Sequence, residues 1–217
     1  PSSQQVCTIG GNVAENSGGA HCLKYGFTTN HVLGVEFVEP SGEVVEIGGK
    51  APDPPGYDLL GAIVGSEGTL GIATRVTVRL TRAPESVQTL LAGFDGTDAA
   101  GQAVSAIIAA GVIPAAVEMM DALAIEAAEA AVHCGYPAGA GAVLVVELDG
   151  PASEVDAQFA QVRELCEKAG AFEIRIAADD VERALFWKGR KSAFAAVGRI
   201  SPDYIVQDGV IPRTALP

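Results

Sequence analysis

A glycine-rich stretch near the start of the chain restricts its fold more than any other segment. It runs from one glycine pair to a second pair, with two amides and a carboxylate between them: Gly10, Gly11, Asn12, Glu15, Asn16, Gly18 and Gly19. Glycine tolerates positive φ and lets a ligand approach the main chain closely, so consecutive N–H groups can converge on an anion such as a phosphate. The alternative is a tight double turn with both asparagines in left-handed conformations. Two glycine pairs around Asn and Glu favour a cofactor loop.

A second glycine cluster occupies residues 65–71, with the sequence Gly-Ser-Glu-Gly-Thr-Leu-Gly. It precedes a predicted strand over 72–81, in which residues 72, 74, 76, 78 and 80 share one face. Neither cluster contains the G-x-G-x-x-G dinucleotide motif or the Gly-Lys-Ser/Thr end of a P-loop. Because neither cluster carries a lysine, we expect main-chain N–H groups to meet the charge of the ligand.

The charge of the chain excludes several partners. It has 14 Lys+Arg against 27 Asp+Glu, a formal net charge of −13, which repels nucleic acids and anionic membrane surfaces. No apolar run is long enough for a transmembrane helix, and the start of the sequence does not have the pattern of a signal peptide. The four cysteines lack a C-x-x-C spacing, and we interpret them as reduced, small core residues of a cytoplasmic protein. The chain starts at Pro1 and stops after an apolar run, so we expect a fragment of a longer protein.

The pattern changes near Pro84, which predicts two domains, residues 1–84 and 85–217. In the first, two β-rich runs around Ser41-Gly42 predict a hairpin, and Asp58 caps a short helical turn. The pattern of the second domain predicts strand, helix, strand, an inserted helix, and then strand, helix, strand. Ser153 is predicted as the N-cap of the helix in the second strand-helix-strand unit. This order is that of a ferredoxin-like unit with an antiparallel sheet, so the fold class is α+β.

A final helix is predicted over 179–197 and contains the only tryptophan, Trp187, three residues before Arg190. The planar fork of an arginine suits bidentate recognition of a carboxylate. On residue types alone, a surface Arg-Lys pair beside a half-buried Trp is the better interpretation. The three histidines lack metal-ligand spacing, so we assign no metal site and no catalytic residue, and we place His133 at a helix C-terminus.

Five motifs in one order resemble the FAD-linked oxidases of the vanillyl-alcohol oxidase superfamily, and within it the glycolate oxidase and D-lactate dehydrogenase group. The motifs lie at residues 9–19 (IGGNVAENSGG), 22–26 (CLKYG), 32–34 (VLG), 56–59 (GYDL) and 64–72 (VGSEGTLGI), and the resemblance as a whole covers essentially the entire chain. For residues 1–84 the resemblance implies the C-terminal part of a PCMH-type FAD-binding domain. For residues 85–217 it implies a ferredoxin-like cap domain that binds substrate and is truncated at its C-terminus.

The resemblance also implies a function: FAD-dependent oxidation of a small 2-hydroxy acid, glycolate or D-lactate, by hydride transfer to the flavin. Arg190 would hold the substrate carboxylate. The residues that would line the cofactor are Gly10, Gly11, Asn12, Glu15, Asn16, Gly18, Gly19, Gly65, Glu67, Gly68, Gly71 and Ile72. Some relatives have a threonine one turn after the arginine and a lysine on the next strand. This chain has Phe194 and Val206 there, which favours a monoacid over a diacid.

Three further expectations follow from the resemblance. Partner subunits of a glycolate oxidase complex are implied, and through them the protein would be peripheral to the inner membrane. The metal and catalytic histidines of the family would lie downstream of Pro217, and an earlier pyrophosphate loop would precede Pro1. The 217 residues alone should therefore bind FAD weakly or not at all. The competing hypothesis is a catalytically inert α+β binding or interaction module whose glycine segments are plain turns.

Overall fold

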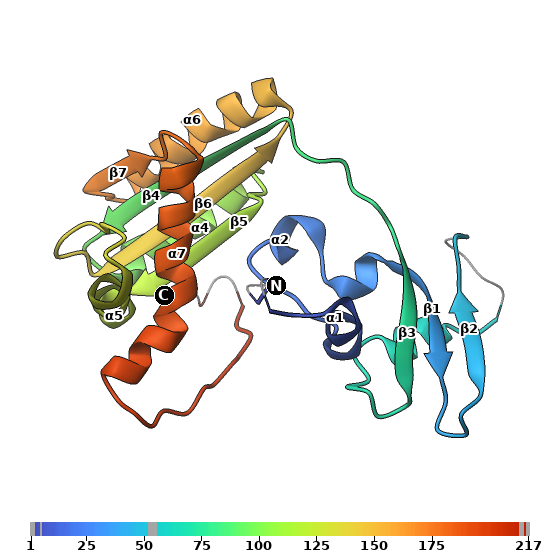
Figure 1. The fold of residues 1–217 in the computed structure, drawn as a ribbon. Helices are drawn as coiled ribbons and strands as arrows, with labels where there is room; N and C mark the ends of the chain where they lie inside the picture. Colours follow the sequence, from blue (N-terminus) through green and yellow to red (C-terminus); the bar gives the residue numbers. More distant parts are fainter. Residues whose placement is uncertain (1–2, 5, 52–55, 213–214, 216–217) are drawn as a thin grey trace. The chain divides into compact units, whose positions relative to one another are not determined.

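The computed structural model describes the chain except for residues 1–2, 5, 52–55, 213–214 and 216–217. The chain divides into two compact units, Pro1–Ala83, called unit 1, and Pro84–Pro217, called unit 2. Figure 1 shows the elements of both. We describe each unit by itself.

Unit 1 is built on a three-stranded antiparallel sheet in the order β2-β1-β3. Strands β1 (Val32–Val38) and β2 (Val44–Gly48) form the predicted hairpin, and Gly42 in its turn has φ 84°. The single face predicted for β3 (Ile72–Val78) is wrong, because the register with β1 shifts between Glu36 and Phe37. Ala73 and Val76 therefore pack on the core, and Ile72 is 67% exposed.

The helices of unit 1 are short: α1 (Ile9–Glu15), α2 (Cys22–Tyr25), the 3-10 turn η1 (Thr28–Asn30) and α3 (Leu59–Ile63). The prediction for α3 is confirmed, since the side chain of Asp58 accepts a 2.8 Å hydrogen bond from Gly61 N–H at the start of the helix. Helix α1 occupies part of the stretch predicted as an open loop. Its Val13 packs with Val35 and Phe37 of β1 in the core of unit 1.

Unit 2 contains a four-stranded antiparallel sheet in the order β5-β6-β4-β7, with strands β4 (Ser86–Phe94), β5 (Ala116–Asp121), β6 (Ala142–Gly150) and β7 (Glu173–Ile176). Helix α4 (Thr97–Ala109) connects β4 to β5, and α6 (Ala152–Lys168) connects β6 to β7. Each β-α-β unit is split by one strand of the other, which is the ferredoxin-like arrangement. The predicted α+β fold class is confirmed.

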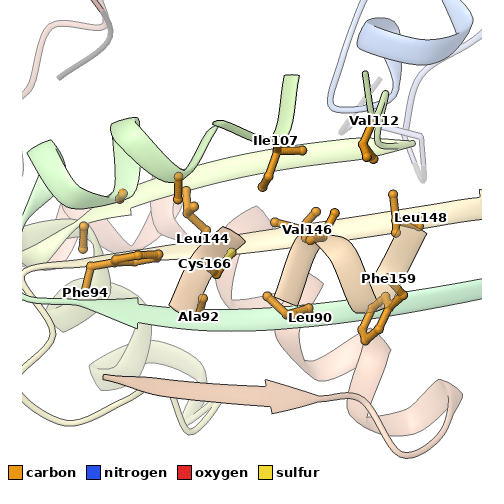
Figure 2. Close-up of a cluster of buried hydrophobic side chains, with 14 of the residues drawn as sticks. Leu90, Ala92, Phe94, Ile107, Val112, Leu144, Val146, Leu148, Phe159 and Cys166 are labelled. Carbon is orange, nitrogen blue, oxygen red and sulfur yellow. The ribbon is translucent and has the colours of Figure 1, made fainter. Parts of the chain in front are cut away.

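Helices cover both faces of this sheet. On one face, alternate residues of β4 and β6, such as Leu90 and Val146, pack against α4 and α6, as Figure 2 shows. Cys166 of α6 lies in this core and is fully buried, as is Cys134, so two of the four cysteines are core residues, while Cys7 and Cys22 are half-buried.

The other face is covered by the remaining helices, α5 (Ala122–Val132) and α7 (Asp180–Ala196), which pack against each other (Figure 1). Helix α7 begins close to the predicted start, after Asp179, whose carboxylate accepts hydrogen bonds from the N–H groups of Val181 and Glu182. The cap predicted for α6 is wrong: the helix begins after Pro151, so Ser153 lies inside its first turn. A 3-10 turn, η2 (Val197–Arg199), follows α7.

Candidate functional site

The first glycine pair lies inside α1 rather than in a loop. Thr8 caps the helix: its Oγ1 accepts a 3.0 Å hydrogen bond from Gly11 N–H, and its carbonyl accepts one from Asn12 N–H at 3.0 Å. These N–H groups are therefore satisfied within the helix, and the predicted anion nest is wrong for them. Asn12 is helical, whereas Asn16 ends the helix in the left-handed region, with φ 46°.

The two glycine clusters lie side by side in unit 1. Gly65 N–H donates to Val13 O at 2.9 Å, and Glu67 N–H donates to Ala14 O at 2.8 Å. Both donors have positive φ, 89° for Gly65 and 54° for Glu67, so the second cluster turns back onto the end of α1. The side chain of Asn16 links this end to the next turn, since its Oδ1 accepts from Thr29 N–H at 2.9 Å.

Two of the predicted cofactor-lining glycines have close neighbours within unit 1. A Cβ on Gly18 would lie 2.7 Å from the ring of Phe27. A Cβ on Gly71, whose φ is 153°, would overlap Val38 O and the ring of Phe37. The main-chain oxygen of Val38 excludes a side chain at Gly71 whether or not a ligand binds, whereas a side chain at Gly18 would require the exposed ring of Phe27 to move.

Two other glycines border open space. A Cβ on Gly10 would meet only Ala73 O, at 3.8 Å, and a Cβ on Gly68 would meet nothing within 4 Å among the described residues. Glu15 and Glu67, which lie on the same two segments, are exposed. The twelve predicted residues include no Lys or Arg. This arrangement fits a ligand that lies against exposed main chain and forms no ion pair with these residues.

Arg190, the predicted carboxylate ligand, lies on α7 in unit 2. Its Nε donates a 2.6 Å hydrogen bond to Oε2 of Glu118 on β5, and the two side chains are 34% and 19% exposed. Sequence reasoning missed Glu118. The interpretation of Arg190 as a plain surface residue is wrong, because the arginine is half-buried and paired with a strand of the sheet.

A buried carboxylate, Glu147 on β6, lies on the same face of the sheet. Its Oε2 accepts hydrogen bonds from Thr89 Oγ1 at 2.8 Å and Trp187 Nε1 at 2.7 Å, and Arg183 Nε lies 3.2 Å away. Glu147 is paired in register with Ala116 of β5, so Glu118, two residues on, points to the same face. Arg183, Trp187 and Arg190 follow one another at i, i+4 and i+7, so one side of α7 lies over both carboxylates.

Residues of the loop after α5 also pack against α7. Tyr136 Oη donates to Phe186 O at 2.7 Å, and a Cβ on Gly189 would clash with Tyr136 Oη and Cys134 Sγ. Burial raises the pKa of the Cys134 thiol to about 12 and also raises the pKa of the Tyr136 hydroxyl. Both groups are therefore neutral packing partners of α7 at ordinary pH.

The histidines have structural roles. His133 is the C-cap of α5, as predicted, with φ 48°, and His31 Nε2 lies 2.8 Å from Tyr25 O. Within the part of the chain that the structure describes, no group of three or more His, Cys, Asp or Glu side chains could hold a metal ion. In that same part, no helix is long and apolar enough to cross a membrane.

Comparison with known families gives two matches. Residues 83–217 match the family described as "FAD linked oxidases, C-terminal domain", and residues 1–48 match "FAD binding domain". Among solved structures, alkyldihydroxyacetonephosphate synthase is similar in fold, with a TM-score of 0.71 over 92% of this chain, 39% of that chain and 22% identity.

Curated relatives extend the similarity to specific enzymes. The chain is 54% identical over its whole length to the glycolate oxidase subunit GlcD of Escherichia coli K12 and 42% identical to that of Bacillus subtilis. It is 31% identical, over 89% of its length, to a D-lactate dehydrogenase of Anaerostipes hadrus. The chain spans 44%, 46% and 42% of these three proteins, respectively, which is less than half of each.

Proposed function

The chain belongs to the FAD-linked oxidases, and on that premise we propose that the full-length protein uses FAD to oxidise a small 2-hydroxy acid, glycolate or D-lactate, to the 2-oxo acid. The observation that carries the proposal is the 54% identity to the glycolate oxidase subunit GlcD, which extends over all 217 residues. Within this proposal, residues 1–84 form the C-terminal half of the FAD-binding domain and residues 85–217 form the substrate-binding cap domain.

Unit 1 would contribute main chain to the FAD site. FAD, when bound, accepts the hydride that is removed from the substrate. Gly10 and Gly68 leave space for a ligand next to the backbone, and the two hydrogen bonds from Gly65 and Glu67 to α1 hold the two segments together. Gly11, Asn12, Asn16 and Gly19 lie on the same segments, so we retain them as candidate cofactor contacts. Gly18 and Gly71 would act indirectly, by allowing the chain to pack.

Unit 2 would supply the group that binds the substrate. Only Nε of Arg190 is bonded to Glu118, which leaves the two Nη groups to receive a carboxylate as a bidentate pair. Glu147, Trp187 and Arg183 hold α7 on the sheet, so the guanidinium is carried by a rigid element. Fixed geometry of this kind favours orientation of the substrate for reaction. The proposal includes no catalytic acid or base among the described residues.

The same relatives suggest how the protein is assembled. GlcD is named as a subunit of glycolate oxidase, and we extend to this protein the proposal of partner subunits. A cytoplasmic protein, peripheral to the inner membrane through those subunits, fits this proposal. Affinity purification of the tagged full-length protein from its native cells, with and without detergent, tests it. Recovery of the protein alone under both conditions would contradict it.

A spectrum of the full-length protein separates the proposed enzyme from an inert binding module. A flavin absorption band in the protein purified without denaturant supports the enzyme. A colourless protein that does not respond to added FAD would support the inert module instead. Turnover with a panel of glycolate, D-lactate, L-lactate and D-2-hydroxyglutarate then identifies the substrate.

A further inference from the structure

We propose that Glu118 is a positioning residue that orients Arg190 and whose negative charge disfavours substrates with a second negative charge; this inference rests on the proposed function. The first observation is the bond between them, a single hydrogen bond from Arg190 Nε to Glu118 Oε2 at 2.6 Å. A guanidinium carries five N–H donors, one on Nε and two on each Nη. Among the described residues, the structure records no partner for the four donors on the Nη atoms.

Both ends of this pair are fixed by secondary structure. Glu118 lies on β5, in register with Val145 of β6, and α7 is held to the same sheet face through Trp187 and Glu147. The Nε bond therefore sets the plane of the guanidinium. Its Nη edge is left to receive a substrate carboxylate end-on, with two parallel hydrogen bonds.

The charge of Glu118 affects every anion that binds at this edge. Arg190 and Glu118 together are neutral, so an arriving carboxylate is attracted by one charge and repelled by the other a few ångströms further away. Coulomb energy scales with the product of the charges, so the repulsion from Glu118 doubles for a compact dianion. Compared with an arginine that lacks this partner, Arg190 beside Glu118 therefore binds all 2-hydroxy acids more weakly, and the loss of binding is largest for small dicarboxylates.

The test uses the full-length, FAD-containing enzyme and two variants of the same residue. Glu118→Gln keeps an oxygen that accepts from Arg190 Nε and removes the negative charge. We expect the KM for glycolate and D-lactate to fall about fivefold with kcat nearly unchanged, and the KM for the dicarboxylate tartronate to fall further. Glu118→Ala removes the acceptor as well, so Arg190 loses its orientation and kcat should fall about tenfold.

Binding of oxamate, a non-reacting monoanion, provides a readout that is independent of turnover. Calorimetry on the same enzyme should give a Kd about fivefold lower in Glu118→Gln than in the wild type. Glu164→Gln is the matched control, because it removes one negative charge from α6, which covers the opposite face of the sheet. The control should leave both KM and Kd unchanged.

The outcomes separate this inference from the function on which it rests. A wild-type enzyme that oxidises no 2-hydroxy acid would overturn both. An active wild type, with a Glu118→Gln variant that matches the Glu164→Gln control in KM, in oxamate Kd and in selectivity against tartronate, would overturn the role of Glu118 alone. A selective fall in KM and Kd, with kcat retained, is the result that the inference predicts.

Discussion

Gly65 N–H donates a 2.9 Å hydrogen bond to Val13 O, and this bond joins two glycine clusters that are far apart in the sequence. Val13 is the buried residue of α1, so the second cluster is attached to a helix that is itself fixed in the core of unit 1. The exposed backbone on both sides of the bond is the surface that we assign to the cofactor. Substitutions at single glycines can separate this role from a purely structural one.

Gly10→Ala should have opposite effects on the protein and on its cofactor. Gly10 is a helical residue with space for a Cβ, so alanine should stabilise the apoprotein by up to about 0.5–1 kcal/mol. If FAD approaches the main chain there, the same methyl group should raise the Kd for FAD. Thermal unfolding of the apoprotein and fluorescence titration with FAD give the two values. An unchanged Kd would remove Gly10 from the cofactor site.

Gly71→Ala is the contrasting variant. A Cβ at this position would overlap Val38 O and the ring of Phe37, and its φ of 153° is unfavourable for other residues. We expect the apoprotein to lose stability by about 1–3 kcal/mol, before any effect of FAD. A stable Gly71→Ala apoprotein with normal unfolding would show that the packing explanation is incorrect.

Arg190→Ala should greatly reduce kcat/KM for 2-hydroxy acids in the full-length enzyme while its FAD content stays normal. Loss of a charge-assisted pair with a buried carboxylate costs about 2–5 kcal/mol, which corresponds to about 30-fold or more in kcat/KM. Arg190→Lys should restore only part of the activity, because lysine keeps the charge but lacks the planar fork. Wild-type kinetics in Arg190→Ala, with flavin retained, would exclude Arg190 from the site.

Glu147→Ala should destabilise unit 2 strongly. It removes the shared acceptor of Thr89 and Trp187 and the partner of Arg183, and breaking a buried pair costs about 3–5 kcal/mol. Glu147→Gln should lose less stability, because the glutamine side chain can still accept hydrogen bonds. Urea unfolding of the 217-residue chain, followed by the fluorescence of Trp187, its only tryptophan, measures both. A loss no larger than that of the exposed control Glu164→Ala would contradict the structural role of Glu147.

The order of elements in unit 2 could be predicted because each element has a strong local signal. Helix α7 begins where Asp179 can accept two N–H groups, and β6 is a nearly continuous apolar run. In unit 1, helix capping and strand pairing determined the structure more than the local sequence pattern did. Thr8 caps a helix that occupies residues predicted as a loop. The register shift beside Phe37 changes which side chains of β3 face the core.

The candidate site was only partly predictable, because it depends on which strands are neighbours. Arg190 could be identified from its spacing to Trp187 and from family resemblance. Its partner Glu118 is distant in sequence and is brought near it only by the packing of α7 on the sheet. Glu147 carried a signal that was overlooked: a carboxylate inside the apolar run of β6 requires buried donors.

The stability of unit 2 should decrease at alkaline pH through Cys166. Burial raises the pKa of this thiol from 9.0 to about 12. The unfolded chain therefore loses the Cys166 proton at a lower pH than the folded chain does. The contribution of the protonated thiol to stability is complete below about pH 9 and is lost progressively as the pH rises toward 12. Urea unfolding at about pH 8 and about pH 10.5 should show a smaller decrease in Cys166→Ala than in the wild type, by about 1–2 kcal/mol. Equal decreases would contradict this account.

The central claim is that the full-length protein is a flavoenzyme that oxidises 2-hydroxy acids, and an anaerobic reduction experiment tests it most directly. The purified protein is mixed with glycolate or D-lactate in the absence of oxygen, and the flavin absorption is followed together with formation of the 2-oxo acid. We predict bleaching of the flavin band with one equivalent of glyoxylate or pyruvate per flavin. A protein without flavin, or a bound flavin that stays oxidised with both acids, would contradict the account.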